Sequence, residues 1–263
     1  MSPSANGTPP RILVVGGGYV GMYTALQLGK KLQRGEATVT VVDPRSYMTY
    51  QPFLPECGAG SIQPRHTVVP LRQTLRDAEV VTGWVTGVEH ARKVATVQPL
   101  EGAPYEIEYD QVVMALGSVP RTLPIPGLAD WAMGFKNIEE ASALRNRVLE
   151  CLDIAETATD PEIRERNLTF VFVGGGYAGV EAMAETEDLA RYATRYLRNV
   201  SPDDLRFVMV EASGRILPEV GEDMGRWTVE QLRERGIDIK LETRLESTID
   251  GHVVLSDGTR MLS

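Results

Sequence analysis

Two glycine-rich segments carry the residue types and the spacing with the most evident chemistry. One contains Gly16, Gly18 and Gly21, and the other contains Gly174, Gly176 and Gly179. Both follow the pattern Gly-x-Gly-x-x-Gly. A glycine turn that leads into a helix leaves backbone N–H groups free and places the positive end of the helix dipole beside them. We therefore interpret each segment as a site that could bind a pyrophosphate.

The three glycines of each pattern have separate roles. The first permits a tight turn out of a strand, the second lets a phosphate approach the backbone, and the third lets the helix pack close to the strand. The next predicted strand after each turn ends on an acid, which is Asp43 in the first copy and Glu211 in the second. A carboxylate at this place accepts hydrogen bonds from a ribose and repels a 2′-phosphate. The second site is thus expected to prefer NADH to NADPH.

The two segments are copies of one device. Residues 11–21 and 169–179 match almost residue for residue. A single glycine pattern is a weak indication, because such turns also occur for packing alone. Here both copies have a predicted strand before the turn, a helix after it and an acid at the next strand end. This repetition predicts two dinucleotide sites.

The residues around the turns predict alternating strands and helices. Strands are expected at 11–15, 37–42, 110–115, 167–173, 205–210 and 238–241, and helices at 20–32, 137–157, 180–198 and 225–235. Short runs between 80 and 113 predict an antiparallel meander, 44–70 a long ordered loop, and 253–258 a hairpin. Such alternation is typical of an α/β fold with parallel sheets.

Composition narrows the class of partner and the compartment. The formal net charge of −9 argues against nucleic acid as a partner, because phosphate-backbone binding needs clustered Lys and Arg. The sequence has no apolar run of the roughly 20 residues that span a bilayer, and residues 1–10 are polar, so we expect a loose N-terminal tail and a cytoplasmic protein. Cys57 and Cys151 are far apart, so neither a disulfide nor a metal site is predicted.

Three further residues could carry chemistry. Glu181 and Glu185 lie in the first turns of the helix after the second glycine turn, where acids also interact favourably with the helix dipole. One interpretation is that both are helix-start acids alone; the other makes Glu181 a catalytic residue beside a nicotinamide ring. Cys57 is either a small, half-buried hydrophobic residue or a redox-active thiol.

The two turns, with residues 115–120 between them, resemble those of the two-dinucleotide-binding flavoproteins of the pyridine nucleotide-disulfide oxidoreductase superfamily. The resemblance implies FAD at the first turn and NAD(H) at the second. Members close the flavin domain with an Ala-Thr-Gly-like segment, which is Ala115-Leu116-Gly117 here, so a hydroxyl at 116 does not carry over. The implied fold is α/β, with two Rossmann-like FAD/NAD(P)-binding domains that contain parallel sheets and an antiparallel β-meander.

Within that superfamily the chain resembles the type II NADH dehydrogenases, which pass electrons to a membrane quinone. The loop 50–72 carries this likeness through Gln51-Pro52, Gly60 and Pro64. The segment 174–185, including both glutamates, and the charged segment 144–149 are similar too. Tyr177-Ala178 and Met183-Ala184 depart from the commoner residues of that family.

The resemblance also implies domain boundaries and a missing part. We expect a flexible tail at 1–10, the first part of an FAD-binding domain at 11–125, an NAD(H)-binding domain at 126–250, and the start of a return to the FAD domain at 251–263. The later Gly-Asp segment and the helical membrane-docking region of these enzymes are not found in the sequence. The chain is therefore interpreted as a fragment that lacks its last third.

The motifs and the resemblance together imply the following cofactor-binding residues and partners. The candidate cofactor-binding residues are Gly16, Gly18, Gly21, Asp43, Gln51, Pro52, Val85, Ala115, Gly117, Gly174, Gly176, Gly179, Glu181 and Glu211, with Glu181 also the candidate catalytic residue. The expected partners are a quinone, the membrane surface at the inner face of the cell membrane in a longer protein, and a second copy in a homodimer. The alternatives are a single-cysteine NADH peroxidase or oxidase that uses Cys57, and a non-catalytic dinucleotide-binding or redox-sensing protein.

Overall fold

The chain divides into two compact units. The computed structural model describes residues 9–120 and 123–263. Unit 1 comprises Met1–Tyr50, of which 9–50 are described, and Val68–Val119; unit 2 comprises Gln51–Thr67 and Pro120–Ser263. The expected boundary near residue 125 differs from this division, because the segment Gln51–Thr67 packs with unit 2. The expected flexible tail at 1–10 lies largely outside the described residues.

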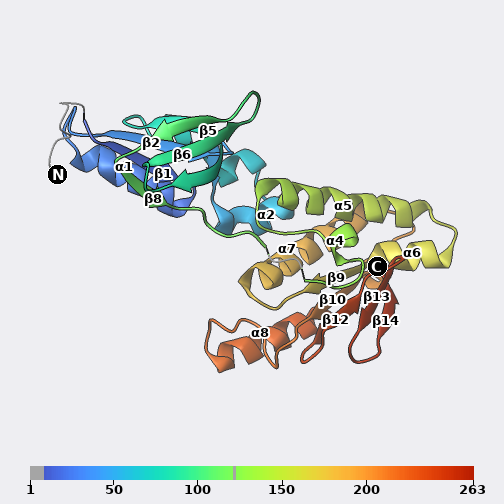
Figure 1. Cartoon of the computed structure of the whole chain (residues 1–263). Helices are drawn as coiled ribbons and strands as arrows, with labels where there is room; N and C mark the ends of the chain where they lie inside the picture. Colours follow the sequence, from blue (N-terminus) through green and yellow to red (C-terminus); the bar gives the residue numbers. More distant parts are fainter. Residues whose placement is uncertain (1–8, 121–122) are drawn as a thin grey trace. The chain divides into compact units, whose positions relative to one another are not determined.

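Unit 1 is built on a six-stranded sheet of order β7-β6-β5-β2-β1-β8 (Figure 1). Its strands are β1 (Arg11–Val15), β2 (Thr38–Asp43), β5 (Glu79–Glu89), β6 (Val94–Pro99), β7 (Tyr105–Glu108) and β8 (Gln111–Met114). β8, β1, β2 and the start of β5 are parallel, whereas β5, β6 and β7 form the expected antiparallel meander. The helix α1 (Tyr19–Lys31) links β1 to β2.

Both faces of β1 are buried, which explains its continuous apolar run. Ile12 and Val14 pack in a cluster with Met22 of α1, while Leu13 and Val15 pack with residues of β6 and with Tyr109. Successive side chains of a strand point to opposite faces, so one apolar strand supplies two cores. The position of the first glycine turn is fixed by this doubly buried strand.

The segment 44–70 is not the plain loop that its Pro and Gly content predicts. It contains β3 (Tyr47–Thr49) and β4 (Val68–Pro70), which pair antiparallel, and between them η1 (Gln51–Phe53), α2 (Leu54–Gly58) and η2 (Pro64–Thr67). The helix α3 (Leu71–Thr74) follows. Leu54 and Cys57 of α2 are buried against Ala141, within unit 2. Long-range packing therefore overrides the local signals.

Unit 2 contains a parallel sheet of order β11-β10-β9. Its elements are α4 (Leu128–Trp131), α5 (Ile138–Thr157), α6 (Pro161–Leu168), β9 (Thr169–Val173), α7 (Tyr177–Ala193), η3 (Thr194–Tyr196), η4 (Pro202–Asp204), β10 (Arg206–Val210), α8 (Glu222–Glu234) and β11 (Asp238–Lys240). Phe207 and Met209 of β10 face a core shared with α5, α7 and α8. The expected long helix of 180–198 is shorter than predicted, because α7 ends at Ala193.

The helix α6 was not predicted, although its start signals are present. Asp160 accepts a hydrogen bond from the Glu162 N–H, and Pro161 occupies the first turn, a combination typical of helix N-termini. Asn167, expected at the start of a strand, lies in this helix, and its Nδ2 donates to the Ile163 carbonyl at 2.8 Å. The helix is short and mostly polar, so apolar periodicity does not reveal it.

The last residues form an antiparallel three-stranded sheet of β12 (Leu245–Ser247), β13 (His252–Leu255) and β14 (Arg260–Leu262). The hairpin expected at 253–258 is the turn between β13 and β14. Val208 and Val210 of β10 pack against Leu245 and Val253, on the face of β10 opposite the helices. Residues 251–263 thus pack within unit 2, and the expectation that they begin a return to the first domain stays a prediction.

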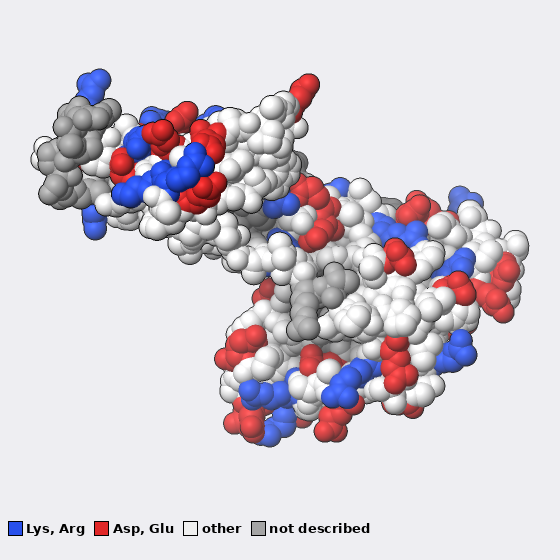
Figure 2. All heavy atoms as spheres, viewed as in Figure 1, with Lys and Arg blue, Asp and Glu red and all other residues white. Residues whose placement is uncertain are grey.

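The surface charge and the apolar character of the helices bear on the expected partners, nucleic acid and membrane. On the face drawn in Figure 2, acidic and basic side chains intermix on both units. Ion pairs account for part of this pattern, as where Arg92 contacts Glu106 at 3.2 Å. Among the described residues, no helix combines the length and the apolar character that crossing a membrane requires.

Candidate functional site

The first glycine turn joins β1 to α1 through backbone that only glycine allows. Gly16 has φ +107°, and a Cβ there would lie 2.2 Å from the Ala115 carbonyl oxygen. A Cβ on Gly21 would lie 1.7 Å from the carbonyl oxygen of Gly16, so α1 approaches the end of β1 as closely as it does because residue 21 has no side chain. Both glycines are required by the fold of the turn itself.

The second glycine turn, between β9 and α7, repeats this geometry. Gly174 has φ +105°, and a Cβ on Gly179 would lie 2.0 Å from the Gly174 carbonyl oxygen. The hydrogen bonds repeat as well, since the Gly16 N–H donates to Val42 at 2.8 Å and the Gly174 N–H donates to Val210 at 2.9 Å. The sequence repeat is therefore a repeat of structure.

The middle glycines of the patterns differ from the others, because nothing in the protein requires them. A Cβ on Gly18 or on Gly176 would meet no atom within 4 Å. These two residues are the N-caps of α1 and α7, and neither helix start receives a side-chain hydrogen bond. Each turn therefore has open space at a helix N-terminus that no side chain caps, which fits the phosphates of a dinucleotide.

The acids at the strand ends bind their own glycine turns. Asp43 accepts a hydrogen bond from the Gly17 N–H at 2.6 Å and from the Arg45 N–H at 2.7 Å. Glu211 accepts from the Gly175 N–H at 2.6 Å and from the Ser213 N–H at 2.7 Å. Each carboxylate oxygen has further lone pairs, so acceptor capacity for ribose hydroxyls remains.

The sequence analysis missed Gly17 and Gly175, which donate these hydrogen bonds. A Cβ on Gly17 would lie 2.5 Å from the Leu71 side chain, and one on Gly175 would lie 2.6 Å from the Ile216 side chain. The signal was present, since each turn reads Gly-Gly-Gly rather than Gly-x-Gly. The central glycine brings the turn close enough for its N–H to reach the acid.

Hydrogen bonding keeps Glu211 ionised over a wide pH range. Burial raises the pKa of Glu211, but the N–H groups of Gly175 and Ser213 favour the charged form and hold the pKa below its usual 4.5 overall. These interactions therefore contribute stability above pH 4.5, and that contribution is lost as the pH falls through the lowered pKa. The second turn keeps its negative charge at any pH at which NADH would be tested.

Three candidate residues lie in unit 1 near the first turn or its sheet. Ala115 follows β8, its N–H donates to Val15 at 2.8 Å, and its carbonyl oxygen adjoins Gly16. Gly117 has φ +69° in the stretch after β8. Val85 lies in β5 beside a β-bulge and is half-buried against the cluster that contains Leu13. Their contact with a cofactor stays a prediction.

Gln51 and Pro52 lie in η1, which belongs to unit 2, whereas Asp43 and the first glycine turn belong to unit 1. The Gln51 Nε2 donates to the Lys136 carbonyl at 3.3 Å. The neighbouring Cys57 is fully buried, and burial raises the pKa of its thiol above the usual 9.0. A buried, protonated thiol is a poor nucleophile, which favours the interpretation of Cys57 as a packing residue.

Glu181 and Glu185 of α7 share a crowded acidic environment with Glu56 of α2. Burial, and then the charge of Glu56, raise the pKa of both Glu181 and Glu185 above the usual 4.5. Glu56 Oε2 is the one buried side-chain oxygen or nitrogen without a hydrogen-bond partner among the described residues. Glu181 and Glu185 therefore hold protons to higher pH than free glutamate does. No set of three or more potential metal ligands gathers in the described part of the chain.

Comparison with known proteins identifies close likenesses. The family model described as pyridine nucleotide-disulphide oxidoreductase matches residues 10–262. The external alternative NADH-ubiquinone oxidoreductase of Yarrowia lipolytica mitochondria is 30% identical over 95% of this chain and 44% of its own length. The type II NADH:quinone oxidoreductase Ndh of Mycobacterium tuberculosis is 29% identical over 98% of this chain and 57% of its own length.

A solved structure shares the fold. The structure of NDH2 from Plasmodium falciparum in complex with NADH superimposes with a TM-score of 0.89 at 20% identity, over 96% of this chain and 53% of that one. The expected fold, with parallel sheets and an antiparallel meander, is thereby confirmed. The chain spans about half the length of the curated relatives it matches.

Proposed function

Because the chain belongs to the pyridine nucleotide-disulphide oxidoreductase family, we propose that it is the dinucleotide-binding part of an FAD-dependent NADH:quinone oxidoreductase of type II. FAD binds at the glycine turn of unit 1, and NADH binds at the glycine turn of unit 2. The observation that carries this proposal is the repeated turn whose middle glycine faces open space at a helix N-terminus.

In each turn, different residues bind different parts of the dinucleotide. Gly18 and Gly176 leave room for a pyrophosphate beside the N-termini of α1 and α7. Asp43 and Glu211 accept hydrogen bonds from the adenosine ribose through the lone pairs that the turn N–H groups leave free. The remaining glycines hold the turn in shape and do not contact the ligand through a side chain.

Other candidate residues position the reacting rings. Gln51, Pro52, Val85, Ala115 and Gly117 are proposed to contact the flavin, and Glu181 to adjoin the nicotinamide. FAD, when bound, supplies the acceptor for hydride from NADH and the donor of electrons to the quinone. The chain itself contributes orientation, exclusion of water and, at Glu181 with its raised pKa, a carboxyl that can hold a proton.

The names of the relatives support a quinone as the electron acceptor. Their names include NADH-ubiquinone and NADH:quinone oxidoreductases, so we propose that a quinone accepts the electrons. Peripheral attachment to the inner face of the cell membrane and a homodimeric state belong to the same proposal for the longer protein. NADH oxidation and membrane binding can each be measured separately, so one can fail without the other.

The proposed function predicts that the purified chain, supplied with FAD, shows visible flavin absorption that bleaches when NADH is added without oxygen. Reoxidation by a soluble quinone should restore the colour. A Cys57→Ser variant should bleach and reoxidise as the wild type does, because the buried thiol takes no part. Loss of turnover in that variant would favour the single-cysteine peroxidase or oxidase. A chain that binds NADH but cannot take up FAD would favour a non-catalytic dinucleotide-binding protein.

Glu211 is expected to set the preference for NADH. The combined change Glu211→Ser and Ala212→Arg removes a carboxylate and adds a cation for a 2′-phosphate, so the ratio of kcat/KM for NADPH to that for NADH should rise at least about tenfold, the effect of one charge-assisted hydrogen bond. Ala212→Arg alone is the matched control and should change the ratio less. If the wild type already oxidises both cofactors equally, the assignment of Glu211 is wrong.

A further inference from the structure

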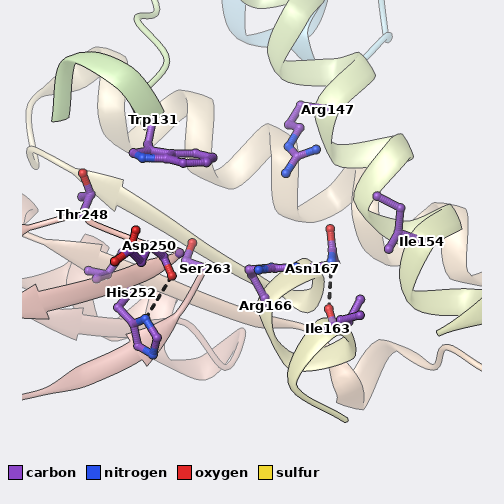
Figure 3. A pocket seen from close by; sticks show the side chains of 12 residues that line it. Trp131, Arg147, Ile154, Ile163, Arg166, Asn167, Thr248, Asp250, His252 and Ser263 are labelled. Carbon is purple, nitrogen blue, oxygen red and sulfur yellow. Dashed lines mark hydrogen bonds between the residues drawn. The ribbon is translucent and has the colours of Figure 1, made fainter. Parts of the chain in front are cut away.

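Unit 2 contains a cavity of about 520 Å³ away from its glycine turn (Figure 3). Dinucleotides bind at the carboxyl ends of parallel strands, where β9 leads into Gly174. The cavity instead adjoins the amino end of β9, because its lining includes Asn167 of α6, two residues before Thr169, and Ser263, whose hydroxyl donates to the Thr169 carbonyl at 3.0 Å. Five residues of strand, roughly 13–17 Å, separate the two ends. The cavity is therefore a separate place on the same unit.

Two guanidinium groups reach this cavity. Arg147 extends from α5 and Arg166 from α6, and Figure 3 shows both side chains directed into it. Arg147 Nη1 donates to Glu150 at 2.9 Å, which leaves its other N–H donors available. Within the described ranges, the side chain of Arg166 forms neither an ion pair nor a hydrogen bond. Guanidinium groups with free donors match the geometry of a phosphate or carboxylate.

An aromatic ring and apolar walls face the same space. Trp131, at the end of α4, is 65% exposed, so its ring is accessible to a ligand. Figure 3 shows its indole on the α4 side of the cavity, with Ile154 and Ile163 on the side formed by α5 and α6. A planar ring would stack on the indole and contact these isoleucines.

The part of the cavity lined by Asp250 and His252 is polar. His252 Nδ1 donates to the Asp250 carbonyl at 3.1 Å, which leaves Nε2 as an acceptor when the ring is neutral. The Asp250 carboxylate forms no hydrogen bond with any described residue, and its backbone has φ +54°, which holds the residue in the turn before β13. A carboxylate and an imidazole nitrogen are acceptors for hydroxyl groups. These two residues thus add recognition of hydroxyl groups to the recognition of an anion by the arginines and of a planar ring by Trp131.

We propose that this cavity binds a small phosphorylated ligand that carries hydroxyl groups and a planar ring, with a nucleoside monophosphate as the simplest probe. Arg147 and Arg166 bind the phosphate, Trp131 stacks on the ring, and Asp250 accepts from the hydroxyls. The volume lies within the range of about 300–1,000 Å³ that is usual for small-molecule sites. The site is independent of the proposed oxidoreductase reaction.

The test follows the fluorescence of Trp131 during titration with AMP. The chain has three tryptophans, so Trp84→Phe and Trp227→Phe leave Trp131 as the only reporter. A Gly176→Val change is added to fill the open glycine turn and remove adenosine binding there. We expect a saturable change in emission, and weaker binding of inorganic phosphate and of adenosine, each of which lacks one part of the recognised ligand.

Substitutions of Arg166 test its contact with the phosphate. Arg166→Ala should weaken AMP binding at least about tenfold, which corresponds to one lost charge-assisted hydrogen bond. Arg166→Lys should recover only part of that loss, because an ammonium group lacks the planar fork. Arg226→Ala, on the exposed surface of α8, is the matched control and should bind as the parent does. The absence of saturation, or equal affinity in the Arg166→Ala and Arg226→Ala variants, overturns the proposal.

Discussion

A Gly176→Val variant should keep the fold of unit 2 and lose NADH binding. The new side chain meets no protein atom within 4 Å of its Cβ, and Gly176 has φ −74°, a backbone conformation open to any residue. The same side chain fills the space in which a pyrophosphate would approach the N-terminus of α7. We expect at least about a hundredfold weaker NADH binding, from the loss of two charge-assisted hydrogen bonds of about 1.5 kcal/mol each.

Fluorescence titration with NADH measures that loss, and thermal unfolding checks the fold. Gly179→Val is the contrasting variant, because its Cβ would lie 2.0 Å from the Gly174 carbonyl oxygen and force α7 away from the turn. It should lower both NADH affinity and the unfolding temperature. If Gly176→Val binds NADH like the wild type, the glycine turn of unit 2 is only a packing turn.

The second large expected effect is a loss of stability in a Glu187→Ala variant. Glu187 of α7 is 1% exposed and forms ion pairs with Arg191 and Arg235. Arg191 also donates to the Pro202 carbonyl at 2.9 Å, and Arg235 to the Ala184 carbonyl at 3.1 Å, so this cluster joins α7 to the segments after it and after α8. Glu187→Ala removes the only buried carboxylate of the cluster and leaves two guanidinium groups without it.

We expect Glu187→Ala to lower the free energy of unfolding by about 3 kcal/mol, near the low end for breaking a buried pair, because both arginines keep contact with water. A loss of that size corresponds to a fall of roughly 6–12 °C in unfolding temperature. Thermal or urea unfolding measures it. Asp188→Ala is the matched control; its side chain is 69% exposed and also contacts Arg235, so its effect should stay below about 1 kcal/mol. Equal effects of the two changes would contradict the special role of Glu187.

The local parts of the fold could be predicted from the sequence because their causes are local. Glycines at fixed spacing after a β-branched run specify strand, turn and helix without help from distant residues. The two turns, β1, β2, β9 and β10 were found within a residue or two for this reason. Asn137 could also be placed at the start of α5, where it accepts from the Glu140 N–H at 2.8 Å.

The parts that were missed depend on contacts distant in sequence. α2 forms in a segment rich in Pro and Gly because Leu54 and Cys57 are buried against α5, roughly 80 residues onward. Likewise, Val253 of β13 finds its place against Val208 and Val210 of β10. No local sequence pattern predicts that α2 packs on α5 or that β13 packs on β10. The direct hydrogen bonds from Gly17 and Gly175 to the acids were missed for another reason, since the fingerprint describes the ligand's partners and not those of the turn.

Each of the two units is built from two separate stretches of the chain, which limits how such a chain could be recombined or divided. The chain passes between the units three times, after Tyr50, Thr67 and Val119. A single crossover in the gene, wherever it falls, would therefore separate one unit from part of itself. The two glycine turns look like interchangeable modules in sequence, yet exchanging one whole unit between relatives requires a crossover at each of the three passages, so that Gln51–Thr67 moves with unit 2.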